Sequence, residues 1–232
     1  MNKKISGIVG VILSIVFLIY LEPLVYMGLD LLGINVSSLT TLLQTLINIG
    51  IKLLMCFLVY IVYKRDFRRR NSRDNLLKNI LLLIVSLIGL TLGMYLFRYV
   101  INYIGDIFSI EVLKLDFYNI FNKTLNLNLI IKIITDYIMV PFLYCSIIIL
   151  SVNKFCRRND TTIVFTGLLA SVVHAFTLSG TLGFVIVNSL YMFLLFGILA
   201  FLYKKTNSIL FIITLYSFYL ISNVFIINCL GW

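Results

Sequence analysis

Charged residues are scarce in this sequence. Of its 232 residues, 12% are Asp, Glu, Lys or Arg and 61% are hydrophobic, whereas about a quarter of a soluble globular protein is charged. This composition excludes an ordinary soluble fold, and its high hydrophobicity also excludes disorder. A membrane-spanning helix needs about 20 apolar residues, so the apolar runs leave little chain for anything else. A large catalytic or binding domain in water is therefore excluded.

Residues that bind metals or act as nucleophiles are also few. Histidine occurs once, at His174, whereas a zinc site needs three or four ligands of suitable type. The four cysteines form no Cys-x-x-Cys pair and mostly lie inside apolar runs, which favours small core residues over a disulfide framework. No Gly-x-Ser-x-Gly motif accompanies the histidine, which argues against serine-protease chemistry. We expect neither a metal nor a cofactor.

What the sequence does contain is a series of seven apolar runs. They predict an all-α fold, a polytopic membrane helical bundle of about seven transmembrane helices forming one integral membrane domain over residues 1–232. The expected spans are about 5–32, 38–63, 79–103, 127–152, 163–178, 182–203 and 208–230. The first run is expected to be a retained helix and not a cleaved signal, because no small-residue cleavage site follows promptly. Glu22 and Pro23 predict a kinked end of this span near the surface.

Positive charge is distributed unevenly between the loops. The net charge is +10, and with the N-terminus inside, only Lys114 and Lys123 among the loop lysines and arginines fall outside. This bias predicts a cytoplasmic N-terminus and an extracellular C-terminus in a bacterial cell membrane. The dense basic stretch 64–78 is interpreted as an orientation signal that lies against anionic membrane lipids, and not as a nucleic-acid site. Residues 106–126 could form an interfacial helix on the outer surface.

Ionisable residues inside the expected spans are candidates for function, because charge at membrane depth is costly. Lys132 and Asp136 are four residues apart on one helix face and are expected to form an intramembrane ion pair. Arg98 lies near the outer end of the third span and is expected to extend toward the interface.

Three segments in the C-terminal half follow one another in an order found in a known family. Residues 197–220 read GILAFLYKKTNSILFIITLYSFYL, His174 lies in LLASVVHAFT, and MVPFLYCSII begins at Met139. Through the order and spacing of these segments, residues 127–223 resemble the CPBP (Abi) family of CAAX-protease and bacteriocin-processing membrane proteins. The resemblance implies a CPBP-like helical core in the C-terminal half.

The resemblance also locates the family's functional positions in this chain. The paired glutamates of the first motif, which are thought to activate water, fall on Met139 and Val140, and the arginine of that motif falls on Tyr144. The phenylalanine before the second-motif histidine falls on Ala170, and the histidine itself is kept as His174.

The final motif of the family, a histidine followed by asparagine, can be aligned in two registers. One register puts these positions at Tyr216 and Leu220, and a slip of three residues puts them at Tyr219 and Asn223, which recovers only the amide. In both registers the general base is missing, and its loss typically costs orders of magnitude in rate. The resemblance therefore implies a degenerate member, a pseudoprotease and not an enzyme.

One carboxylate could still replace the missing glutamates. Asp136 lies one turn before Met139, but a turn is about 5 Å and catalysis tolerates little displacement. An ion pair with Lys132 would also keep Asp136 ionised.

Three functions remain open. The chain could be a membrane scaffold or regulator of a partner membrane protein, a bacteriocin self-immunity protein that captures a peptide, or a residual CAAX-type endopeptidase. A transporter is less favoured, since no pair of repeated broken halves is evident. We predict that Met139, Tyr144, His174 and Tyr216 surround one intramembrane cavity.

Overall fold

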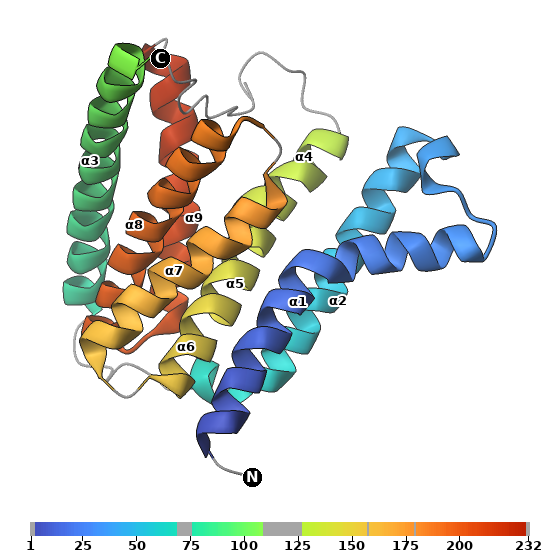
Figure 1. Cartoon of the computed structure of the whole chain (residues 1–232), viewed down its shortest axis with the longest axis horizontal. Coiled ribbons are helices and arrows are strands. Elements are labelled where there is room, and N and C mark those ends of the chain that lie inside the picture. Colours follow the sequence, from blue (N-terminus) through green and yellow to red (C-terminus); the bar gives the residue numbers. More distant parts are fainter. Residues whose placement is uncertain (1–2, 69–75, 109–126, 157, 179, 231–232) are drawn as a thin grey trace.

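The computed structural model describes residues 3–68, 76–108, 127–156, 158–178 and 180–230, and within these ranges the chain is helical without a β-strand (Figure 1). Each of the seven expected spans corresponds to one helical segment, which confirms the predicted all-α bundle. These segments are α1 (Lys3–Leu31), α2 (Thr41–Arg68), α3 (Leu76–Phe108), a fourth helix from α4 (Leu127–Ile134) to α6 (Leu150–Phe155), α7 (Asn159–Thr177), α8 (Leu182–Thr206) and α9 (Ile209–Leu230). A short 3-10 turn, η1 (Val36–Ser38), lies between α1 and α2.

Five described helices are long and apolar enough to cross a membrane. They cover Thr41–Phe67, Lys78–Ile107, Thr135–Phe155, Asn159–Thr177 and Leu182–Thr206, and a shorter apolar helix covers Ile209–Val224. Several such helices in one chain identify a multi-pass helical membrane protein, because only helices and closed barrels satisfy their backbone polar groups in lipid.

The fourth helix differs from the single regular span that the sequence predicts. It continues to Phe155 and contains two π-helical segments, η2 (Thr135–Met139) and η3 (Cys145–Ile149), on either side of α5 (Val140–Tyr144). The Val140 amide donates to the Thr135 carbonyl, five residues earlier. Pro141, next along the chain, has no amide hydrogen to continue an α-helical ladder. Each π segment contains one more residue per turn than an α-helix, and such segments are frequent at functional sites.

The helices on either side of the first two loops also extend further than predicted. Within the expected basic loop 64–78, α2 continues to Arg68 and α3 begins at Leu76, while 69–75 lie outside the described residues. In the expected interfacial segment, α3 continues to Phe108 and 109–126 lie outside the described residues. Charged side chains are tolerated in these terminal turns because helix ends reach water or headgroups.

The first helix bends away from the bundle in its second half (Figure 1). Pro23 lies inside α1, and a proline inside a helix removes a hydrogen bond and causes a kink. The kink at Glu22-Pro23 was predicted, but the helix does not end there and continues to Leu31.

The centre of the protein is built by the fourth helix together with α7, α8 and α9. The α7–α8 hairpin is the most extensively packed pair of helices. At their crossing, a Cβ atom on Gly167 would lie 2.6 Å from the Phe193 carbonyl oxygen, so only glycine allows this approach. A small residue at a close helix contact is typical of membrane bundles.

The turn between α8 and α9 explains why these helices lie side by side and antiparallel. Asn207 ends α8 in the left-handed conformation, with φ of 50°, which asparagine tolerates better than most residues. The Ser208 hydroxyl then accepts a hydrogen bond from the Phe211 amide at 3.3 Å and caps the start of α9.

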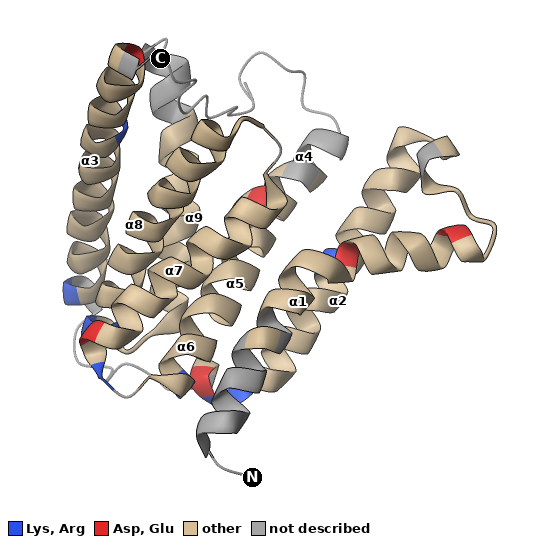
Figure 2. Cartoon of the chain, in the orientation of Figure 1, with Lys and Arg blue, Asp and Glu red and all other residues tan. Residues whose placement is uncertain are grey.

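Charged residues gather at one end of the bundle, the lower end in Figure 2. We call this the basic end, because it carries the chain segments with Lys64, Lys78, Lys154, Lys204 and Lys205. The middle parts of the helices that lead away from the basic end are mostly apolar, as the distribution of charge in the sequence predicts.

Candidate functional site

A row of aromatic rings crosses the centre of the bundle at the positions that the family resemblance points to. Tyr144 of α5 faces Phe196 of α8, with 6.4 Å between ring centroids. Phe196 meets Tyr216 of α9 edge to face at 5.6 Å. Tyr216 stacks with Tyr219 one turn later at 6.5 Å. These are favourable geometries for aromatic pairs, and Phe196, Tyr216 and Tyr219 are all buried. We call these four residues the aromatic row.

The row continues to α3 through a hydroxyl pair. The hydroxyls of Tyr191 in α8 and Tyr219 in α9 hydrogen bond to each other, and Phe97 of α3 packs 6.5 Å from the Tyr191 ring. Since a buried tyrosine needs a partner for its hydroxyl, this pair satisfies two polar groups deep in the bundle.

The hydroxyl pair belongs to a polar cluster that includes Arg98. Arg98 is half-buried and lies close enough to Tyr95, Tyr191 and Tyr219 to act electrostatically on each of them. Asn223 follows Tyr219 by one turn on α9 and is 2% exposed. We call Tyr95, Arg98, Tyr191, Tyr219 and Asn223 the tyrosine–arginine cluster. The expectation that Arg98 extends toward the membrane interface stays a prediction.

Sequence reasoning named Arg98, Tyr216 and Asn223 separately but did not bring them together. Tyr95 and Tyr191 were missed. A signal for Tyr95 was present in the sequence, because Thr91, Tyr95, Arg98 and Asn102 are spaced by four, three and four residues, which places them on one helix face. All four are half-buried, whereas Leu92, Leu96 and Tyr99 on the opposite face are exposed.

The other end of the aromatic row approaches an acidic residue. Glu22 of α1 is half-buried and lies close enough to Tyr144 to act electrostatically on it. The Tyr26 hydroxyl, one turn later on α1, hydrogen bonds to the Glu22 carboxylate. Glu22 was expected near the surface, which stays a prediction, and the structure places it at the kink of a helix that continues through Pro23.

Apolar side chains, buried or half-buried, occupy the two positions that align with the family's glutamates. Met139 is 9% exposed and Val140 is half-buried. Asp136 is half-buried as well, while the Lys132 side chain lies outside the described residues, so the predicted ion pair between them stays a prediction. Neither Met139 nor Val140 can accept a proton or activate water.

His174 is half-buried on α7. Among the described side chains, no hydrogen bond, ion pair or ring contact joins its imidazole to Tyr144 or Tyr216. Leu220 is half-buried and Asn223 is buried. The structure thus brings Tyr144 and Tyr216 to either side of Phe196 and links Tyr219 to the cluster. The convergence of His174 with them in one cavity stays a prediction.

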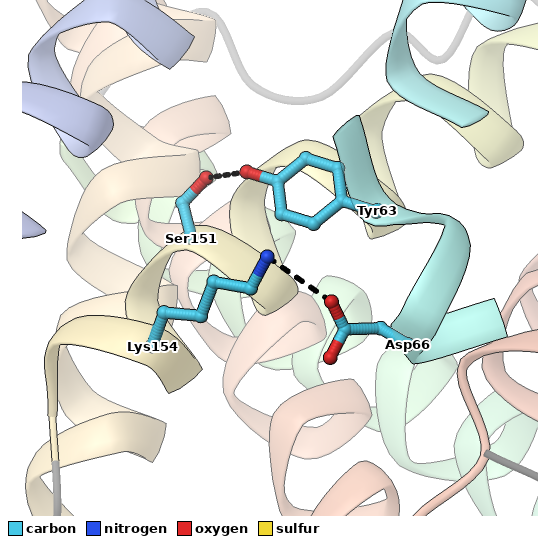
Figure 3. A network of polar contacts seen from close by, with 4 residues as sticks. All are labelled: Tyr63, Asp66, Ser151 and Lys154. Carbon is cyan, nitrogen blue, oxygen red and sulfur yellow. Dashed lines mark hydrogen bonds and ion pairs between the residues drawn. The ribbon is translucent and has the colours of Figure 1, made fainter. Parts of the chain in front are cut away.

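A second polar group ties the helices together at the basic end (Figure 3). The Tyr63 hydroxyl of α2 lies 2.6 Å from the Ser151 hydroxyl of α6, and Lys154 Nζ lies 3.1 Å from Asp66 Oδ2. The same ammonium lies 4.2 Å from the centre of the Tyr63 ring, within the range of a cation–π contact. These contacts hold α2 against α6, so we interpret this group as structural.

Within the described part of the chain, no three His, Cys, Asp or Glu residues are placed to hold a metal ion. The polar groups at the centre are hydroxyls, the free thiol of Cys145, one amide, one guanidinium and one more distant carboxylate. Comparison with family models, with curated proteins and with solved structures finds no match to this chain.

Proposed function

We propose that this protein is a non-catalytic membrane protein, a degenerate relative of the CPBP proteases, that acts by holding or regulating a partner membrane protein. The observation that carries the proposal is the packing at the motif positions. Tyr144 and Tyr216 are separated by the Phe196 ring, and Met139, five residues before Tyr144 on the same helix, is buried as well. Peptide hydrolysis needs a water molecule and a base at this point, and apolar side chains occupy it.

The kind of partner follows from how little of the described chain lies outside helices. Long membrane helices account for nearly all the described residues, so a partner has to be met within the bilayer or at its surface. Among the described side chains, α2 and α3 carry the most exposed large hydrophobic residues, with Phe57, Leu92 and Leu96 each more than half exposed. Membrane helices associate through close packing and hydrogen bonds.

Site-specific photocrosslinking in native membranes tests the proposal. A photoreactive residue would replace Leu92 or Leu96 on α3, or Phe57 on α2, with the buried Leu215 of α9 as the matched control. We expect one membrane protein to be captured from one of these faces and not from position 215. Capture of lipid alone at every exposed position would contradict the proposal, and capture of a secreted peptide would support the immunity function instead.

An activity assay separates the proposal from residual proteolysis. The purified protein, incubated with prenylated peptides in detergent or vesicles, is expected to release no cleavage product. His174→Ala and Glu22→Gln should leave partner capture unchanged, because neither residue forms part of the exposed α2 or α3 face. Cleavage by the native protein that disappears in His174→Ala would identify an enzyme.

A further inference from the structure

Lys52 places a positive charge in the middle of a membrane helix. It lies on α2, eleven residues after Thr41 and twelve before Lys64, so roughly three helical turns separate it from either end of the apolar stretch. A lysine close to a helix end can extend its ammonium to the membrane surface. Because Lys52 is far from both ends, its charge lies at the depth of the hydrocarbon.

No side chain in the described part of the chain neutralises this charge. Lys52 is half-buried, and it forms neither an ion pair nor a hydrogen bond with any residue that the structure describes. The carboxylate of Glu22, on the neighbouring α1, accepts a hydrogen bond from Tyr26 instead. An ionisable side chain at this depth is costly and usually pairs with an opposite charge. The missing counter-charge therefore has to come from outside these residues.

The Lys52 ammonium can be reached from outside the bundle. In Figure 1, α1 and α2 lie at the edge of the bundle opposite α3, and in the most apolar stretch of α2 only 17% of the residues are buried. Among the described polar atoms that are buried without a hydrogen bond, α2 contributes the Asn48 carbonyl oxygen and not the Lys52 nitrogen. The ammonium thus has neither a partner nor full cover within the described chain.

The surface beside Lys52 is apolar. Leu53 and Phe57 on α2 are 52% and 61% exposed, so this face meets either lipid tails or another helix. Lipid tails offer neither a negative charge nor a hydrogen-bond acceptor, and the headgroups lie too far away. A membrane helix of another protein can cover the apolar side chains and neutralise the ammonium together, provided that it carries a carboxylate at the same depth.

We propose that this face of α2 binds a transmembrane helix that carries an Asp or Glu at mid-membrane, and that Lys52 pairs with its carboxylate. Pairing removes two charges from contact with lipid, which drives the association, and packing of Leu53 and Phe57 against the partner helix adds to it. The inference rests on the proposed function, because it states the chemistry by which the partner membrane protein is recognised.

Association of synthetic transmembrane peptides with the purified protein in lipid vesicles tests the proposal. The probes are a leucine-rich helix of about 20 residues with one Asp at its centre, and the same helix with Leu or Lys at that position. Energy transfer between labelled peptide and labelled protein measures each affinity. We expect the Asp peptide to bind about tenfold or more tightly than the other two, because it alone can form a charged hydrogen bond with Lys52.

Variants of the protein show whether Lys52 is the residue recognised. Lys52→Leu should weaken binding of the Asp peptide about tenfold or more, and Lys52→Arg should retain most of it because the charge is kept. Lys52→Glu should instead prefer the Lys peptide, since the charges of the pair are exchanged. Lys64→Leu is the matched control, because it removes a lysine of the same helix at the basic end, and it should leave the affinity unchanged. If Lys52→Glu fails to fold, the comparison of Lys52→Leu with Lys64→Leu still decides.

The same variants in native membranes separate this inference from the proposed function. Photocrosslinking from position 57 should capture the partner in the Lys64→Leu background and lose it in the Lys52→Leu background. Capture that persists in Lys52→Leu would leave the proposed function standing and overturn the inference. If no membrane protein is captured in any background, the proposed function fails, and the peptide affinities still decide whether Lys52 recognises a carboxylate.

Three further results would overturn the proposal. Equal affinities for the Asp and Leu peptides would show that the ammonium takes no part in recognition. A Glu22→Gln variant that binds the Asp peptide about tenfold more tightly than the native protein would show that Lys52 is already paired within the chain. A crosslinked product from position 57 that contains two copies of this chain and no other protein would assign the face to self-association.

Discussion

The fourth helix and α3 are both long apolar helices, but the rest of the bundle encloses them to different extents. In the most apolar stretch of Thr135–Phe155, 56% of the residues are buried, against 17% in the corresponding stretch of Lys78–Ile107. The fourth helix is contacted by α1, α2, α7 and α9, whereas α3 packs mainly on α8 and α9. The buried helix is interrupted by two π segments and the peripheral helix is regular. Protein packing thus supports irregular backbone here, and lipid surrounds the regular helix, as the bilayer requires.

The largest expected difference between the central helices and α3 is in the loss of stability when a glycine is replaced by leucine. Gly167→Leu should remove most folded protein, or destabilise it by about 3 kcal/mol, because a Cβ atom there meets the Phe193 backbone oxygen at 2.6 Å. Gly93→Leu on α3 is the matched change, since nothing lies within 4 Å of a Cβ at that position. Size-exclusion profiles after stepwise heating in mild detergent would measure both. Equal loss in the two variants would show that the α7–α8 crossing is not especially close.

A difference of similar size is expected for phenylalanine. Phe196 is fully buried between Tyr144 and Tyr216, and Phe196→Ala should reduce the free energy of unfolding by about 3 kcal/mol through the cavity it leaves. Phe57 on α2 is 61% exposed, so Phe57→Ala should have little effect. Reversible unfolding in mixed micelles gives both values. If Phe196→Ala left the free energy of unfolding unchanged, the aromatic row would not be packed in solution.

The polar contacts at the basic end should contribute less. Tyr63→Phe removes the hydrogen bond to Ser151 at 2.6 Å and should cost about 1 kcal/mol, whereas Tyr60→Phe, at a more exposed position on the same helix, should cost almost nothing. The same unfolding assay applies. If Tyr60→Phe lowered the free energy of unfolding as much as Tyr63→Phe, the loss would come from removing any tyrosine hydroxyl and not from the hydrogen bond to Ser151.

The smallest effect is expected for the ion pair between Lys154 and Asp66. The lysine side chain is 50% exposed and the aspartate 13%, and pairs near water usually contribute at most about 1 kcal/mol. A double-mutant cycle with Asp66→Asn and Lys154→Gln measures the coupling. A coupling energy well above 1 kcal/mol would show that this end of α2 is held by charge and not by the Tyr63 contact.

The sequence predicts the helices well because each long apolar run indicates one membrane helix. In the structure, each run corresponds to one helical segment. The sequence does not predict the π segments, because residues 135–149 are apolar on nearly all sides and offer no polar face whose periodicity would reveal an added residue. The apolar composition that suits this helix to the centre of the bundle also hides its irregularity from the sequence.

The candidate site was predicted in parts. Arg98 attracted attention because charge is rare in apolar runs, and Asn223 because one register of the family's final motif falls on it. Tyr191 and Tyr219, however, are 28 residues apart in sequence, and nothing local indicates their pairing. Glu22 was expected near the surface because a proline often ends a helix. Here α1 continues through Pro23, and the carboxylate lies close enough to Tyr144 to act electrostatically on it.

The π segments of the fourth helix also affect which changes in chain length the protein can accept. A π segment is an α-helix with one residue inserted, so deleting one residue from Thr135–Met139 would restore an α-helical turn and leave both flanking faces in their present orientation. The same deletion within regular α8 would rotate every later side chain by about 100° and move Phe196 or Tyr203 out of the core. The most buried helix is therefore also the one in which the chain can most readily be shortened by a residue.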